Sequence, residues 1–178
     1  DLRQLQGVLI CIKKMNAMKT AIIYTSNHGT TESVAQCIAN GLLDMDVSLI
    51  NLKKDKIPSL DVFEQIILGA SIHAGNIQSR MKKFMASQMV TLLEKRIGLF
   101  LCCMDEKQAE NQFNNAFPQL LRNHAIASAC PGGEFNFNRM NFIEKAIVKK
   151  VSGIDHSVST INHQKIDAFI ERMLQVNE

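Results

Sequence analysis

Five short apolar runs alternate with longer amphipathic stretches along this sequence of 178 residues. The runs are continuous and rich in β-branched residues, which is typical of strands buried on both faces of a parallel sheet. They lie at residues 20–25, 46–52, 65–71, 96–102 and 125–130. Parallel neighbours need crossover connections, and these are right-handed, so the pattern predicts a three-layer α/β sandwich with helices on both faces.

Four of the amphipathic stretches have the spacing of helices, at residues 30–43, 78–93, 105–123 and 162–175. In the last one, a single apolar stripe is formed by Ile166, Phe169, Ile170, Met173 and Leu174. Asn162 precedes this stripe and is a suitable N-cap. A length of 178 residues predicts a single domain with a full core, and the hydrophobic content of 46% is ordinary for a soluble globular protein.

About thirty residues between the fifth strand and the last helix, at 131–160, do not fit the alternation and predict an insertion. Pro131, Gly132 and Gly133 predict a loop at its start. Residues 139–151 predict a helix with Met140, Ile143, Ile147 and Val151 on one face. The basic residues of this helix, Arg139, Lys145, Lys149 and Lys150, outnumber Glu144. Its apolar face either packs on the sheet or contacts an anionic partner such as a lipid surface.

The amino terminus and the cysteines carry weaker signals. Residues 1–17 are interpreted as a non-native extension of a domain that spans 18–178, with an added edge strand as the alternative, because Met18 opens the first apolar run. No apolar run approaches the roughly 20 residues that span a bilayer. None of the five cysteines forms a C-x-x-C pair, which favours free thiols in a reducing cytoplasm.

The turn between the first strand and the first helix reads YTSNHGTT, from Tyr24 to Thr31. Its hydroxyl, amide, imidazole and glycine groups are those of Ser26, Asn27, His28, Gly29, Thr30 and Thr31. Backbone N–H groups at a helix start favour an anion, and such a turn lies where α/β sheets bind ligands. The same residues are also good turn and N-cap formers, so composition alone leaves both interpretations open.

Several phosphate-binding motifs are excluded at this turn. A Walker A loop needs a lysine after its last glycine, and a dinucleotide fingerprint needs G-x-G-x-x-G; neither is present. A low-molecular-weight phosphatase loop would need a cysteine nucleophile and an arginine, and this turn contains neither residue. A receiver domain would need an aspartate at the end of the third strand, which instead ends in Gly69-Ala70-Ser71.

The seventeen residues IIYTSNHGTTESVAQCI, from 22 to 38, resemble the flavodoxin family. The resemblance implies a flavodoxin-like fold with strand order 2-1-3-4-5, and FMN as cofactor. It also implies that Ser26 to Thr31 wrap the FMN 5′-phosphate with hydroxyls and backbone amides, without a cationic clamp. His28 is either the exception to this rule or a solvent-facing turn residue.

By the same resemblance, the flavin ring lies against two further loops, GASIHAGN at 69–76 and LCCMDEK at 101–107. The implied contacts are Ala70, Ser71, Ile72, His73, Ala74, Gly75, Cys102, Cys103, Met104 and Asp105. The chain has no Trp and one Tyr, so the usual aromatic sandwich is missing and His73 takes the place of the loop aromatic. Cys102 and Cys103 are interpreted as packing residues, with a redox role as the alternative. No side chain is nominated as catalytic, and no metal site is expected.

Three segments are similar to the menaquinone-dependent protoporphyrinogen oxidase branch of the family: GASIHAG, IQSRMKKF and NRMNFIEKAIVKKVSG. This similarity implies an FMN oxidoreductase of haem biosynthesis that uses a porphyrin substrate and a quinone. The net charge of +3 agrees with it, because electron-carrier flavodoxins are usually acidic, which steers them to basic reductases.

Two further functions stay open. One is an FMN electron-transfer module that serves an unidentified redox partner, and the other is a non-redox module that lost its cofactor, which the intact loop argues against. We expect no nucleic-acid partner. The expected location is the cytoplasm, with peripheral contact on the inner face of the cell membrane through the basic helix 139–151.

Overall fold

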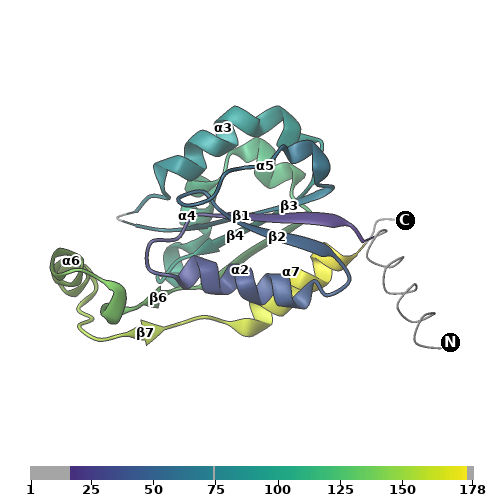
Figure 1. Cartoon of the computed structure of the whole chain (residues 1–178). Coiled ribbons are helices and arrows are strands. Elements are labelled where there is room, and N and C mark those ends of the chain that lie inside the picture. Colours follow the sequence, from purple (N-terminus) through teal and green to yellow (C-terminus); the bar gives the residue numbers. More distant parts are fainter. Residues whose placement is uncertain (1–16, 74, 176–178) are drawn as a thin grey trace.

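The computed structural model describes residues 17–73 and 75–175. The predicted extension 1–17 therefore lies outside the described residues, apart from Ala17. Five parallel strands form one sheet in the order β2-β1-β3-β4-β5, as predicted (Figure 1). The strands are β1 Lys19–Tyr24, β2 Asp46–Asn51, β3 Gln65–Ser71, β4 Arg96–Cys102 and β5 Ala127–Gly132.

Helices cover both faces of this sheet and complete the predicted three layers (Figure 1). On one face lie α2 (Thr30–Gly41) and α7 (His163–Leu174), and on the other lie α3 (Ser79–Leu93), α4 (Ala109–Ala116) and α5 (Gln119–His124). Short 3₁₀ turns add η1 (Leu60–Val62) and η2 (Glu106–Gln108). Asn162 caps α7, as predicted, by accepting a hydrogen bond from the backbone N–H of Lys165.

The single helix predicted at 105–123 is wrong, because the chain breaks it into η2, α4 and α5. Phe117 leaves the helical conformation, with φ −112° and ψ 132°. It precedes Pro118, whose ring disfavours helical backbone at the preceding residue. The break turns Phe117 into the core, where it is buried against the sheet.

The loop predicted to open at Pro131 begins later, because Pro131 and Gly132 continue β5. β5 is an edge strand, which tolerates a residue without an N–H donor. Its pairing with β4 shifts register between Phe100 and Cys102. Gly132 has φ 97°, and a Cβ there would collide with the backbone of Thr160, so the insertion crosses the strand end at close range.

The predicted insertion is an arm with its own structure. Two short strands, β6 (Glu134–Phe135) and β7 (Val158–Ser159), pair antiparallel at its base. Between them lie the 3₁₀ turn η3 (Phe137–Arg139) and α6 (Phe142–Ser152). α6 begins with a capping box between Asn141 and Glu144 and ends at Gly153 in the left-handed conformation.

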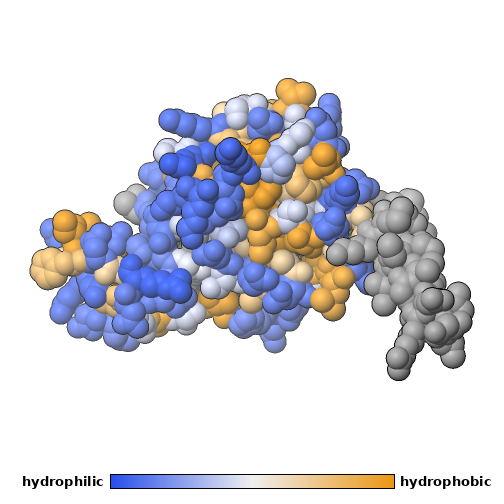
Figure 2. All heavy atoms as spheres, in the orientation of Figure 1, coloured by the Kyte–Doolittle hydropathy of each residue, from blue (hydrophilic) through white to orange (hydrophobic). Residues whose placement is uncertain are grey.

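The expectation that the insertion helix packs its apolar face on the sheet is wrong. Figure 1 shows α6 apart from the helical layers, beyond the end of the sheet where α2 starts. Phe142, Ile143 and Ile147 are 87%, 68% and 53% exposed. Figure 2 shows orange, hydrophobic surface at this tip.

Candidate functional site

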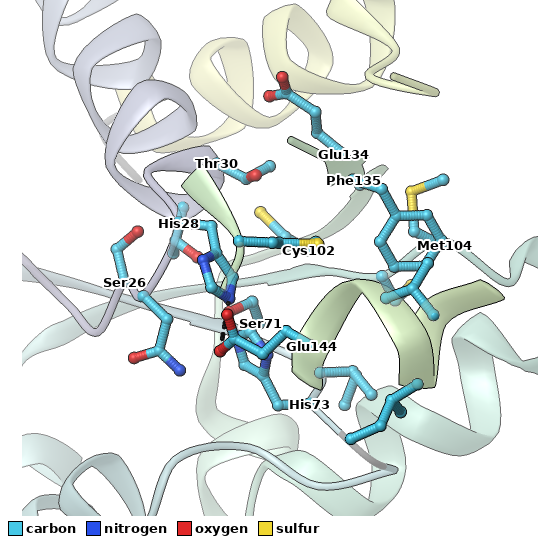
Figure 3. A pocket seen from close by; sticks show the side chains of 18 residues that line it. Ser26, His28, Thr30, Ser71, His73, Cys102, Met104, Glu134, Phe135 and Glu144 are labelled. Carbon is cyan, nitrogen blue, oxygen red and sulfur yellow. Dashed lines mark hydrogen bonds and ion pairs between the residues drawn. The ribbon is translucent and has the colours of Figure 1, made fainter. Parts of the chain in front are cut away.

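A cavity of about 330 Å³ lies where β1, β3 and β4 end, between these strand ends and the insertion (Figure 3). Three loops line it from the sheet side, and β6, Met140 and α6 line its other side. Carboxyl strand ends at the point where strand order reverses are the usual ligand sites of open α/β sheets. Here the chain passes from β1 to β2 on one side and then to β3 on the other side of β1. The strand order therefore reverses at β1, whose carboxyl end borders the cavity.

Eleven of the sixteen predicted site residues line the cavity. They are Ser26, Asn27, His28, Thr30, Thr31, Ser71, Ile72, His73, Cys102, Cys103 and Met104. Three loops distant in sequence are thus brought together, as the sequence predicts, because parallel strands end at one edge of the sheet.

Four other predicted site residues that the structure describes do not line the cavity. Ala70 is fully buried in β3, where it packs into the core below α3. The side chain of Asp105 turns back to accept hydrogen bonds from the N–H groups of Lys107 and Gln108. Gly75, with φ 78°, and Gly29 also lie outside the lining, and Ala74 lies outside the described residues.

The turn after β1 presents the start of α2 to the cavity. Gly29 is the N-cap with φ 94°, and its N–H donates to Ser26 Oγ at 3.0 Å. Thr30 and Thr31 follow in the first helical turn, where N–H groups and the helix dipole favour an anion.

Thr31 carries a second indication of a ligand. Its side-chain hydroxyl is buried and makes no hydrogen bond of normal geometry, although it lies near enough to Cys102 to act on the pKa of that thiol. Buried hydroxyls are nearly always satisfied, so a missing partner needs an explanation. A phosphate at the helix start would provide one, and the residues present therefore fit the phosphate group of FMN.

His28 is not a solvent-facing turn residue, since its side chain is only 13% exposed. Its Nε2 lies 3.4 Å from Glu144 Oε1, and its Nδ1 lies 3.3 Å from the carbonyl oxygen of Arg139. The guanidinium of Arg139 donates in turn to the carbonyl oxygen of His28 at 3.3 Å. His28 thus joins the turn after β1 to the insertion.

His73 points into the same cavity, with its ring centroid 5.5 Å from that of His28 (Figure 3). Burial lowers the pKa of His73, and the neighbouring His28 lowers it further, so the ring is neutral at physiological pH. Its Nε2 lies 3.2 Å from Ser71 Oγ, and Ser71 Oγ accepts a hydrogen bond from the side-chain amide of Gln78. A neutral imidazole offers the cavity a group that can accept a proton.

The adjacent cysteines have different environments. Burial raises the pKa of Cys102 to about 12, so this thiol stays protonated. A hydrogen bond with Cys130 of the neighbouring strand lowers the pKa of Cys103, which lines the cavity. Cys102 is therefore interpreted as a packing residue. Cys103 remains a free thiol, and its hydrogen-bond partner is Cys130 and not the adjacent Cys102.

Several residues of the insertion line the cavity that the sequence reasoning did not place there: Gly133, Glu134, Phe135, Met140, Glu144, Ile147 and Val148. Figure 3 shows the Phe135 ring beside Met104, on the side of the cavity away from Ser26. The sequence places Met140 and Ile147 on one helix face, but periodicity does not tell what that face contacts. Among the described residues, no His, Cys, Asp or Glu cluster could hold a metal ion.

Residues 21–160 match the family model described as a flavodoxin domain. The fold is similar to that of a short-chain flavodoxin associated with a non-canonical PDU bacterial microcompartment, with a TM-score of 0.56 and 12% identity. That match covers 88% of this chain and 97% of the other. Megasphaera elsdenii flavodoxin matches with a TM-score of 0.51 and 19% identity, over 62% of this chain and 84% of the other.

Rubredoxin oxygen:oxidoreductase from Desulfovibrio gigas matches with a TM-score of 0.52 and 14% identity, over 92% of this chain and 39% of that longer one. No curated protein sequence matches the chain. At these identities the solved structures show the fold, and the family model covers most of the sequence. The chain belongs to the flavodoxin-domain family.

Proposed function

We propose that this protein is an FMN-dependent oxidoreductase that dehydrogenates protoporphyrinogen and delivers the electrons to a membrane quinone. Bound FMN would supply the electron chemistry, and the protein would hold and orient it. One observation carries the proposal: the insertion adds an apolar wall to the cavity at the strand ends. Phe135, Met140, Ile147 and Val148 form this wall. The wall suits an apolar second ligand, which an electron carrier does not need.

The residues of the turn after β1 would hold the cofactor phosphate. Ser26, Thr30 and Thr31 offer hydroxyl groups there, and the start of α2 offers backbone N–H groups. The loops after β3 and β4 would hold the flavin ring through Ile72, His73 and the segment 102–104. The neutral His73 is placed to accept a proton that leaves a substrate, because it opens onto the same cavity.

Electrostatics support an anionic ligand. The insertion helix carries Lys145, Lys149 and Lys150 against Glu144, which favours encounter with anions over encounter with basic reductases. A porphyrin that carries propionate groups and an anionic membrane surface are both compatible with this charge. The expected location is the cytoplasm, on the inner face of the cell membrane.

An FMN electron-transfer module is the alternative, and the size of the cavity favours it. At about 330 Å³ the cavity lies near the lower end of the roughly 300–1,000 Å³ typical of ligand sites. A cavity of this size suits one ligand better than two. The module would then pass electrons to a redox partner at its surface.

An anaerobic assay separates these functions. Protein reconstituted with FMN is mixed with protoporphyrinogen and a soluble menaquinone analogue, and porphyrin fluorescence is followed. We expect fluorescence that requires the protein, the FMN and the quinone analogue together. A protein that binds FMN and is reduced chemically, yet forms no porphyrin, would be the electron-transfer module. Protein that binds no FMN would exclude both functions.

Delivery of electrons to a membrane quinone requires contact with the membrane, and the exposed apolar face of α6 is the predicted contact surface. Phe142 and Ile143 lie on it next to basic residues, and no described helix is long and apolar enough to cross a bilayer. We expect the double variant Phe142→Ser/Ile143→Ser to lower the affinity for anionic vesicles by about tenfold or more. Burial of each apolar side chain in the membrane surface contributes about 1.4 kcal/mol or more, and about 1.4 kcal/mol corresponds to a tenfold change in affinity.

The matched control is Val90→Ser/Leu120→Ser, which removes two apolar side chains that are 76% and 61% exposed on α3 and α5. Co-sedimentation with vesicles measures both variants against wild type. Equal loss in both double variants, or no loss in the α6 variant, would contradict membrane contact through α6.

A further inference from the structure

Positive charge gathers around the turn after β1, from two other parts of the chain. The Nζ of Lys53, just after β2, donates to Asn27 Oδ1 at 2.8 Å. The guanidinium of Arg139, from η3 of the insertion, donates to the carbonyl oxygen of His28 at 3.3 Å. Arg139 and Asn27 are more than a hundred residues apart, so only the folded chain brings both cations to this turn.

These cations lie at a place that is already electropositive. The turn is the N-terminus of α2, whose dipole repels cations and attracts anions. The nearby carboxylates have other partners: Glu144 pairs with His28 and caps α6, and Glu32 accepts a hydrogen bond from the Tyr24 hydroxyl. Cations at a helix N-terminus are unfavourable by themselves, but they become favourable when a dianion binds there.

An unsatisfied buried hydroxyl provides independent evidence for that anion. Thr31 is 1% exposed and lines the cavity at the start of α2, and its Oγ1 makes no hydrogen bond of normal geometry. Thr31 belongs to the first turn of α2 and Arg139 to the insertion, so the two observations come from separate elements. Both concern the turn after β1.

Gly29 shows how close the insertion comes. A Cβ on Gly29 would collide with the guanidinium of Arg139, so the charged group lies directly over the backbone of the turn. The positive φ of 94° at Gly29 also disfavours other residues. The guanidinium itself is exposed at the rim of the turn, where its remaining N–H donors are free to turn toward a bound phosphate.

We propose that Arg139 is a ligand of the FMN phosphate, so that the insertion supplies the cation that the turn itself lacks. The inference rests on the proposed binding of FMN. A guanidinium suits this role because its donors match a phosphate in pairs and it stays charged at all physiological pH values. His28 and Glu144 hold the arm in place, which fixes the position of Arg139 over the turn.

The test compares FMN with riboflavin, which lacks the phosphate. We expect Arg139→Gln to raise the Kd for FMN by about 10- to 100-fold, the range for lost hydrogen bonds to charged groups, and to leave the Kd for riboflavin within about twofold. Lys150→Gln is the matched control, because it removes one exposed positive charge from α6 in the same arm. We expect this control to bind both flavins as wild type does. Flavin fluorescence titration measures each Kd.

Salt dependence separates a direct charge contact from a loss of support for the turn. Wild-type affinity for FMN should fall as ionic strength rises, and it should fall less steeply in Arg139→Gln. An unchanged Kd for FMN, an equal loss for both flavins, or an unchanged salt dependence would overturn the role of Arg139 and leave the proposed function standing. Wild-type protein that binds no FMN would overturn both.

Discussion

Replacement of Phe100 by alanine is expected to lower the free energy of unfolding by about 3–5 kcal/mol, the cost typical of a large aromatic removed from a core. Phe100 lies at the centre of β4 and is 0% exposed. Its ring meets Phe169 of α7 edge-on, with centroids 6.5 Å apart, and it covers Gly69 of β3, where any Cβ would collide with it. Gly69 has no side chain, so it could not fill the space left by the Phe100 ring.

Phe142→Ala is the matched control, because it makes the same substitution at a side chain that is 87% exposed on α6. It should change the free energy of unfolding by no more than about 0.5 kcal/mol. Denaturant unfolding of the three proteins, monitored by circular dichroism, gives the comparison. A loss below about 1 kcal/mol in Phe100→Ala would show that the core between the sheet and α7 is not packed as described.

Replacement of Thr31 by valine is expected to weaken FMN binding by about 10- to 100-fold while the stability of the protein without FMN stays the same or rises slightly. Valine has nearly the shape of threonine but lacks the hydroxyl, which here is buried without a normal hydrogen bond. Removing an unsatisfied group costs the free protein nothing, whereas the bound state loses a donor to a charged phosphate. The substitution should therefore lower the affinity for FMN strongly while the free energy of unfolding without FMN stays unchanged or rises slightly.

Thr91→Val in α3 is the control for this substitution, since Thr91 lies on the opposite face of the sheet from α2. It should leave the Kd for FMN unchanged. Flavin fluorescence titration gives the Kd, and thermal unfolding without FMN gives the stability. A Thr31→Val protein with wild-type affinity for FMN would remove Thr31 from the phosphate site. A large loss of stability would instead show that its hydroxyl has a partner in the free protein.

Local chemistry explains why the sheet and the turn could be predicted. A strand buried on both faces must be a continuous apolar run, and a strand-to-helix turn must use residues with small side chains or a free φ. Both requirements act over a few neighbouring residues and can therefore be recognised in the sequence. β1 is an example of the first, and Gly29 is an example of the second. The helix predicted at 105–123 failed for a local reason too, since Pro118 stands in its middle.

The insertion could be predicted as a helix but not as a wall of the site. Periodicity places Met140 and Ile147 on one face of the predicted helix 139–151, and packing of that face on the sheet is one of two expectations. The structure places these residues at the cavity instead, because Arg139 and Glu144 contact His28 across more than a hundred residues of sequence. Contacts of this kind depend on the path of the arm past Gly132 and Thr160.

By itself, the sequence determined the five buried strands, the turn of YTSNHGTT and the resemblance that leads to FMN, because each depends on patterns within a few consecutive residues. Only the tertiary structure decided what faces that turn. The insertion brings Glu144 and the ring of Phe135 to the cavity and Arg139 to the turn beside it, and it leaves Phe142 and Ile143 exposed to solvent. An amphipathic pattern states that a face is apolar, but the partner of that face is determined by how the whole chain packs.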